Sequence, residues 1–250
     1  MAVFDFDRVS KLAPAVPRER TEASPCAACA VRSMTICAPL DNQELAQVSA
    51  LMTSVELTAG EPLFDEGENA GNVYNVTSGT VKVYKLLPDG RRQVTGFLFP
   101  GDFVGLAKQE TYAFSAEAVT PCLLCRFPRH KLEVLMQCMP KIEQRLLNIA
   151  SNELVAAQEQ MLLLGRKTAR EKIASFLLML SKRARQRSQA DDPVMVPMSR
   201  TDIGDYLGLT TETVSRTFTQ LKQDGVIQLL PNHQVKLAQR ETLEEIAGGF

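Results

Sequence analysis

Features that would indicate an enzyme are scarce in this 250-residue sequence. It has only two histidines, His130 and His233, which provide no histidine-based metal site. It contains no glycine-rich loop of the kind that binds nucleotides and no clear nucleophile with a base beside it. A redox enzyme or electron carrier that uses the cysteines is the remaining catalytic alternative, and no other motif supports it. We therefore expect a protein that is not an enzyme.

Long apolar runs are also lacking. The first residues include acidic side chains, and no apolar stretch is long enough for a signal peptide or a membrane span. We therefore expect a cytoplasmic protein with no membrane partner. In that reducing compartment its six cysteines are more plausible as free thiols, metal ligands or redox groups than as structural disulfides.

The net charge is close to zero, at −1, but it is unevenly distributed. Residues 165–240 carry 13 lysines and arginines against 7 aspartates and glutamates, whereas the rest of the chain carries 15 against 22. A basic C-terminal segment on an acidic body is typical of a nucleic-acid-binding protein. The charge alone leaves a solvated basic surface without a partner as an equal alternative.

The length and an apolar content of 45% suit two domains of ordinary size. Residues 1–25, with three prolines and no periodicity, predict a flexible arm. Residues 26–139 begin with a cysteine-bearing loop and a short amphipathic helix (41–53). Several β-rich runs follow over residues 55–127, and turns that contain glycine separate these runs. This rhythm predicts a small antiparallel barrel or sandwich. We expect this part of the chain to be the sensor domain, a β-roll.

Residues 140–165 have helical periodicity. Apolar residues recur there at alternating spacings of three and four, at Leu147, Ala150, Leu154, Ala157, Met161 and Leu164. Such a narrow stripe favours pairing with a second helix, so we expect a dimerisation helix and a homodimer. The alternative is a helix that packs along its own barrel, which we expect Ile142, Leu146 and Ile149 to do on the adjacent face.

Residues 166–250 predict a winged helix-turn-helix. Ser199 is placed to cap a helix over 200–206, Gly208 supplies a sharp turn, and Thr210 caps a second helix. The second helix directs Val214, Phe218 and Leu221 inward, and it is followed by a short β-hairpin over 226–237, the wing. The predicted fold class is therefore α+β: an N-terminal antiparallel β-roll, a long helix, and a C-terminal winged helix-turn-helix.

The outward face of that second helix carries Thr211, Glu212, Ser215 and Arg216. An arginine can donate two hydrogen bonds to guanine, a glutamate can accept one from cytosine, and a serine can reach a base edge or the methyl group of thymine. A glutamate would weaken purely electrostatic binding to phosphates. The face therefore predicts a site that reads bases in double-stranded DNA.

Taken together, these segments resemble the CRP/FNR superfamily of transcription regulators, closest to its oxygen-sensing branch. The resemblance is strongest in the runs Leu162-Leu163-Leu164-Gly165-Arg166-Lys167-Thr168-Ala169-Arg170-Glu171-Lys172 and Asp205-Tyr206-Leu207-Gly208-Leu209-Thr210-Thr211-Glu212-Thr213-Val214-Ser215-Arg216. It implies palindromic sites with TTGAT-type half-sites, and a contact with RNA polymerase near residues 88–92.

The resemblance also bears on cyclic AMP. The relatives that bind this ligand use a Gly-Glu-Leu turn and an arginine before Ser-Ala or Thr-Ala. This chain has Val104-Gly105-Leu106-Ala107 and Phe114-Ser115-Ala116 instead. Because a buried phosphate without an arginine is costly, we expect no cyclic AMP in this protein.

Three cysteines, Cys26, Cys29 and Cys37, lie within twelve residues. Their spacing alone leaves an iron–sulfur cluster, structural zinc and a thiol switch open. The resemblance favours an oxygen-labile [4Fe–4S] cluster and implies Cys125 as the fourth ligand, with Cys122 as the alternative. A strand would point these two cysteines to opposite faces. We expect the sixth cysteine, Cys138, to be a buried apolar residue without a role.

Overall fold

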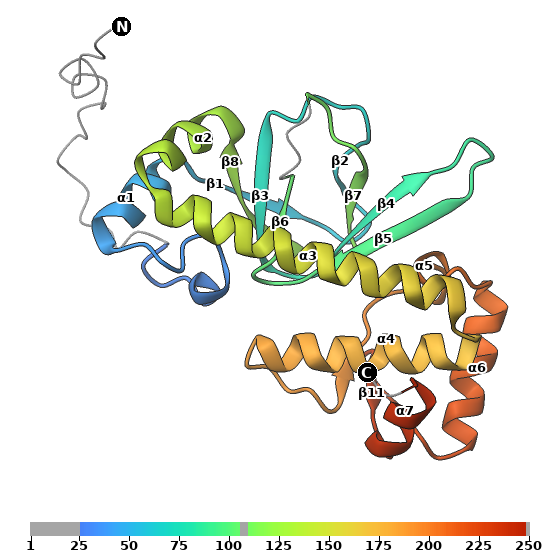
Figure 1. The fold of residues 1–250 in the computed structure, drawn as a ribbon. Helices are drawn as coiled ribbons and strands as arrows, with labels where there is room; N and C mark the ends of the chain where they lie inside the picture. Colours follow the sequence, from blue (N-terminus) through green and yellow to red (C-terminus); the bar gives the residue numbers. More distant parts are fainter. Residues whose placement is uncertain (1–25, 106–109, 249–250) are drawn as a thin grey trace, which may run out of the picture.

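The computed structural model describes residues 26–105 and 110–248, so the arm predicted over residues 1–25 and part of the 104–107 segment lie outside the described residues. A β-roll occupies the N-terminal part, a helical domain the C-terminal part, and the long helix α3 (Pro140–Arg166) runs between them (Figure 1). This order of roll, long helix and winged helix-turn-helix confirms the predicted fold class.

The β-roll consists of two four-stranded antiparallel sheets. Their strand orders are β1-β8-β3-β6 and β2-β7-β4-β5. A cluster of apolar side chains fills the space between them, among them Val76, Val81 and Leu124. The strands are β1 (Thr53–Leu57), β2 (Pro62–Phe64), β3 (Asn72–Ser78), β4 (Val81–Leu86), β5 (Arg92–Leu98), β6 (Phe103–Val104), β7 (Ser115–Ala118) and β8 (Cys122–Pro128).

A second apolar cluster lies outside the roll and anchors the cysteine-bearing loop. The loop contains a short 3₁₀ turn (Arg32–Met34) and leads into α1 (Asn42–Leu51), which Asp41 caps. Buried Ile36 of the loop packs in this cluster with the first turns of α3. Ile142, Leu146 and Ile149 belong to the same cluster, so this face of α3 packs against its own chain as expected.

The C-terminal domain is a winged helix-turn-helix. Its core includes Phe176, Ile203, Val214, Phe218 and Leu221, together with Val94, Phe97 and Phe99 from the β5 region of the roll. Its elements are α4 (Ala169–Gln186), β9 (Val194–Met195), α5 (Arg200–Leu207), α6 (Thr211–Gln223), β10 (Gln228–Leu230), β11 (Gln234–Lys236) and α7 (Arg240–Ile246).

Several details differ from the sequence predictions. The chain forms a separate helix, α2 (Arg129–Cys138), directly after β8, where no helix was predicted. Cys138 ends this helix and is exposed rather than buried, because the apolar side of α2 faces away from it. The wing is a three-stranded sheet, since β9 from the predicted loop pairs with β11. No described helix is both long and apolar enough to cross a lipid bilayer.

Candidate nucleic-acid interface and cysteine pocket

The helix-turn-helix is built by local capping. Ser199 and Asp202 form a capping box at the start of α5, and Gly208 ends that helix in the left-handed conformation with φ of 62°. Thr210 then caps α6 by accepting a hydrogen bond from the backbone of Thr213. These caps fix where each helix begins and therefore which residues of α6 face outward.

The outward face of α6 is accessible. Thr211, Glu212, Ser215 and Arg216 are all exposed, whereas Val214 is fully buried on the opposite side of the helix. In the free protein Arg216 donates a hydrogen bond to Glu212 at 2.5 Å, one helical turn away. The contact is exposed and uses one of the five N–H donors of Arg216, so both side chains keep further hydrogen-bonding groups directed outward.

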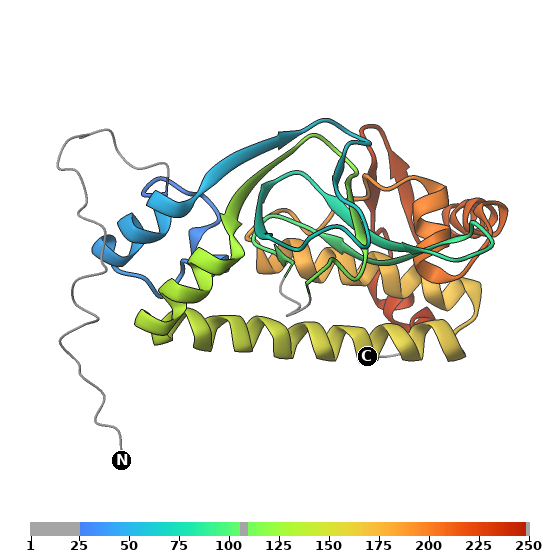
Figure 2. The same cartoon turned by 90° about the horizontal axis from the view of Figure 1, so that it is seen from above.

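The long helix α3 has an exposed apolar surface. Leu147, Leu154 and Met161 of the predicted seam are 66%, 61% and 63% exposed, which is unusual for large apolar side chains. Ala150 and Ala157 are also exposed. Two further residues, Val155 and Leu162, widen the surface beyond the predicted stripe. Figure 2 shows α3 running along one side of the molecule from α2 to the C-terminal domain.

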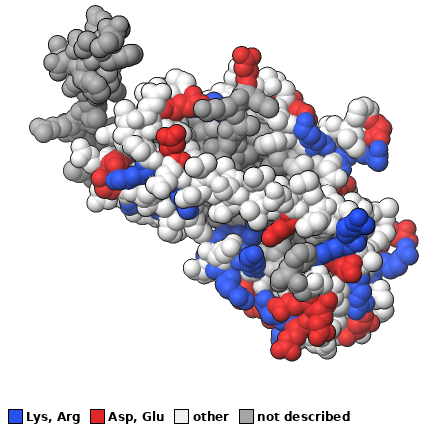
Figure 3. Space-filling model, in the orientation of Figure 1, with Lys and Arg blue, Asp and Glu red and all other residues white. Residues whose placement is uncertain are grey.

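One seam residue behaves differently. Leu164 is half-buried, because it packs against its own helix-turn-helix near Gly208. The remaining seam lies along a part of the surface with few charged side chains, whereas charged side chains of both signs are frequent over the C-terminal domain (Figure 3). An uncharged helix face of this kind suits association of two copies.

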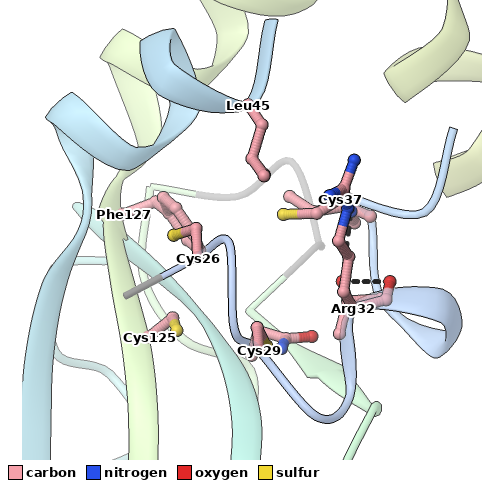
Figure 4. A pocket seen from close by; sticks show the side chains of 10 residues that line it. Cys26, Cys29, Arg32, Cys37, Leu45, Cys125 and Phe127 are labelled. Carbon is pink, nitrogen blue, oxygen red and sulfur yellow. Dashed lines mark hydrogen bonds between the residues drawn. The ribbon is translucent and has the colours of Figure 1, made fainter. Parts of the chain in front are cut away.

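The structure brings four cysteines to one pocket. Cys26, Cys29 and Cys37 come from the loop and Cys125 comes from β8, and all four line the pocket together with apolar Leu45 and Phe127 (Figure 4). Cys122 lies on the opposite face of β8, buried in the roll interior. The pocket thus joins a loop that precedes the roll to the last strand of the roll.

The pocket changes the acidity of its thiols. Burial raises the pKa of Cys37 to about 11 and that of Cys125 to about 12, and the neighbouring thiols act in the same direction. Both side chains therefore keep their protons at neutral pH, and a metal group that binds thiolates must displace them. Among the described residues, no three cysteine, histidine or carboxylate side chains stand close enough to hold a single metal ion.

Two arginines hold the loop around the pocket. Arg32 donates a hydrogen bond to the carbonyl of Leu40 at 2.6 Å, which closes the loop on itself. Arg145 reaches from α3 to the carbonyls of Met34 and Thr35, at 2.7 and 3.2 Å. The hydroxyl of Thr35 in turn accepts a hydrogen bond from the backbone N–H of Cys37.

Asn75 is a further residue of the pocket. It is 4% exposed, lines the pocket with the four cysteines, and lies directly opposite Cys125 in the pairing of β3 with β8. Its Oδ1 is the only fully buried side-chain oxygen or nitrogen without a hydrogen-bond partner among the described residues. Neither Asn75 nor Arg145 was predicted as a site residue. A polar residue on the core face of an apolar strand was the available signal for Asn75.

Two segments of the chain match known domain families. Residues 54–138 match the cyclic nucleotide-binding domain, and residues 171–246 match the Crp-like helix-turn-helix domain. The winged helix-turn-helix and the exposed face of α3 thus define a protein of the DNA-binding, dimerising class.

Similar proteins identify the family. The nitrogen fixation regulation protein FixK of Bradyrhizobium diazoefficiens is 42% identical over 205 residues, which cover 82% of this chain and 86% of the relative. The transcriptional activator protein FnrL of Cereibacter sphaeroides is 40% identical over 227 residues, or 89% and 92% of the two chains. The solved structure of FixK2 from Bradyrhizobium japonicum superposes with a TM-score of 0.73 at 38% identity, covering 78% of this chain and 96% of that one. The chain belongs to the CRP/FNR family of transcription regulators.

Proposed function

We propose that this chain is an oxygen-responsive transcription regulator that binds palindromic TTGAT-type sites as a homodimer while a [4Fe–4S] cluster is in place. Cys26, Cys29, Cys37 and Cys125 would hold the cluster. The observation that carries the proposal is their arrangement around one pocket, formed by a loop that packs against the first turns of the dimerisation helix α3.

We favour a cluster over a single ion in this pocket. Zinc–sulfur bonds of about 2.3 Å draw four sulfurs to within about 4 Å of one another. In the described residues, no three cysteine side chains form a group that could hold one ion. A [4Fe–4S] cluster takes one thiolate at each of four iron atoms and therefore needs ligands around a larger volume. When bound, the cluster would supply the reactivity towards oxygen.

The chain's own residues would transmit the state of the pocket. Arg145 fastens the carbonyls of Met34 and Thr35 to α3, so a rearrangement of the loop pulls on the beginning of that helix. Leu147 and Leu154, which would contact the partner, follow within the next turns. Loosening of the loop would thus weaken pairing of the two α3 helices by shifting an equilibrium between protomer arrangements.

Pairing would set the spacing of the two recognition helices. A dimer presents two copies of α6 about one helical turn of DNA apart, and each copy then reads one half-site. Arg216 would donate to guanine, Glu212 would accept from cytosine, and Ser215 and Thr211 would lie over the neighbouring bases. One half-site alone binds weakly, so affinity for the whole site would depend on dimerisation.

The β4–β5 hairpin would contact RNA polymerase. Its tip lies around residues 86–92 and points away from the roll, beside α5 (Figure 1). Leu86 and Leu87 at the tip are 61% and 41% exposed, next to charged Asp89 and Arg91. Exposed apolar side chains beside charges are common at protein interfaces.

Cyclic AMP has no part in the proposal. The rings of Phe64 and Tyr112 stack in the roll with centroids 3.7 Å apart, and Phe114 packs against the same cluster. Tyr112 also donates a hydrogen bond to the carbonyl of Asn72. These aromatic side chains fill part of the roll interior, and Phe114 is the residue that the sequence comparison matches to the arginine of cyclic-AMP-binding relatives.

The decisive experiment is anaerobic purification followed by absorbance and metal analysis. We expect a coloured protein with four irons and four sulfides per chain, which prefers a palindromic TTGAT duplex over random DNA and loses both properties in air. A colourless protein with stoichiometric zinc would refute the cluster. The Cys125→Ser variant should lose the colour, whereas Cys122→Ser should retain it.

A further inference from the structure

Asn75 is a buried polar side chain in the cysteine pocket, and its Oδ1 has no hydrogen-bond partner. Its neighbours on the same face of β3 and β8 are Val73 and Phe127, both buried. A buried amide oxygen without a partner costs about 1–3 kcal/mol. The chain nevertheless keeps an asparagine at this position, although a leucine of nearly the same shape would avoid that cost.

The backbone fixes where the side chain lies. Asn75 on β3 and Cys125 on β8 are direct partners in the antiparallel ladder, and such partners share one face of the sheet with Cβ atoms about 5 Å apart. Asn75 also pairs with Phe103 of β6 on its other side, so the strand has neighbours on both edges and no room to shift. The amide therefore stays beside the Cys125 sulfur, inside the pocket.

An amide offers two N–H donors at one end and a carbonyl oxygen at the other, and half a turn of the terminal torsion exchanges them. Thiolates and inorganic sulfides only accept hydrogen bonds. We propose that Asn75 donates a hydrogen bond to the sulfur of Cys125, or to a sulfide next to it, when the pocket is filled, and so limits the oxygen lability of the cluster. This inference rests on the proposed function.

The chemical reason is that hydrogen bonds to the sulfurs help to set the reduction potential of an iron–sulfur cluster. A donor withdraws electron density from the sulfur and makes loss of an electron harder. Asn75 would then be a positioning residue that tunes the cluster without binding iron, in the way that outer hydrogen-bond partners tune other metal sites.

The test compares Asn75→Leu with the wild type and with Val76→Ala. Val76 is the next residue on β3, is fully buried, and faces the roll interior instead of the pocket. In air-saturated buffer we expect the cluster absorbance of Asn75→Leu to decay about fivefold faster than that of the wild type, as loss of one ordinary hydrogen bond predicts. Its midpoint potential should also be lower. Val76→Ala should change neither quantity.

The protein without a cluster gives a second, independent result. The buried amide oxygen of Asn75 has no hydrogen-bond partner, so Asn75→Leu should unfold at a higher temperature than the wild type, whereas Val76→Ala should unfold at a lower one. A substitution that stabilises the empty protein and makes the cluster more labile is not explained by a structural role alone.

The outcomes separate the two claims. If the wild type assembles no cluster, the proposed function and this inference fail together. If the wild type assembles one and Asn75→Leu decays at the same rate with the same potential, only the inference fails. Should Asn75→Leu not assemble a cluster, Asn75→Ala provides the same comparison, and equal decay of that variant and the wild type would overturn the inference.

Discussion

The ammonium group of Lys82, on β4, lies 3.0 Å from Oδ1 of Asp202, on α5, although 120 residues separate them in the sequence. Arg92 of β5 contacts the same carboxylate at 3.0 Å and also contacts Asp205. Asp202 is at the same time the residue that closes the capping box with Ser199. One carboxylate therefore fixes both the start of the helix-turn-helix and its position on the β4–β5 hairpin.

Lys82 should contribute measurably to stability, because its side chain is only 7% exposed and its ammonium group pairs with both Asp202 at 3.0 Å and Glu117 at 2.8 Å. We expect Lys82→Met to lower the free energy of unfolding by about 2 kcal/mol, less than for fully unpaired buried charges because Arg92 still contacts Asp202 and Glu117 is partly exposed. Urea denaturation measures this change in the free energy of unfolding. The matched control is Lys85→Met, whose pair with Glu66 is largely exposed and should be worth less than about 1 kcal/mol. Equal losses in the two variants would contradict this assignment.

The interactions of the Asp202 carboxylate should make the stability of the folded protein depend on pH. Burial works to raise the pKa of Asp202, but hydrogen bonds from Ser199 and Lys82 and the charges of Lys82 and Arg92 outweigh it and hold the pKa below its ordinary value of 3.8. A lowered pKa stabilises the folded protein above the ordinary value, and the stabilisation is lost as the pH falls through the folded value.

The wild type should therefore exceed Asp202→Asn in unfolding free energy by a constant amount between about pH 5 and 7. The difference should shrink below pH 3.8. Chemical denaturation of both proteins across this range measures it, and a difference that grows on acidification would be inconsistent with the ion pairs.

Substitution in the exposed face of α3 should separate the protomers. We expect Leu154→Glu to raise the dimer dissociation constant by more than about tenfold, since burying a leucine contributes about 1.5–3 kcal/mol in each protomer. Sedimentation velocity measures the constant. Val134→Glu is the control, because Val134 has the same exposure of 61% but lies on α2. If both variants stay dimeric, the partner surface lies elsewhere.

Arg216→Ala should remove base recognition without affecting dimerisation. Loss of a bidentate contact costs about 1–3 kcal/mol in each half-site, so affinity for the palindrome should fall at least about tenfold while affinity for random DNA changes little. Lys222 lies at an exposed position near the end of the same helix. Lys222→Ala should weaken binding to the palindrome and to random DNA to a similar degree, and it should make DNA affinity less dependent on salt concentration. Binding titrations at two salt concentrations distinguish them.

Arg145→Ala should uncouple the loop from the dimerisation helix. In the wild type, cluster loss should weaken the dimer; in Arg145→Ala this change should be smaller, and the amides of residues 32–37 should exchange hydrogen faster even without a cluster. The control is Lys141→Ala. Lys141 is a cation one turn earlier on α3, and it contacts Glu44 of α1 instead of the loop. Identical exchange rates in the two variants would show that Arg145 is not the link.

The sequence identified the elements whose signals are local. Ser199, Gly208 and Thr210 fix helix ends through their own backbone neighbours, so the helix-turn-helix could be predicted from spacing and capping alone. The stripe on α3 was visible for the same reason. Its neighbours Val155 and Leu162 were not, because a strict heptad pattern excludes them although they are exposed.

Contacts between segments that are far apart in the chain could not be predicted from the sequence. Nothing near Asn75 in the chain indicates that β3 pairs with β8 and places it opposite Cys125. Lys82 and Asp202 are also far apart in the sequence, and the residues around each of them indicate only an ordinary surface charge. α2 was missed because it begins directly at the end of β8, without a separating loop or a side-chain cap.

The core of the C-terminal domain includes Val94, Phe97 and Phe99 of the roll, and Phe97 packs against Phe176 and Tyr206 with ring centroids 6.2 and 5.2 Å away. The DNA-binding part is therefore not a detachable module. A fragment cut after α3 would leave aromatic surface uncovered and tend to aggregate, and a chimera with another regulator would need the β5 segment transplanted together with the helix-turn-helix.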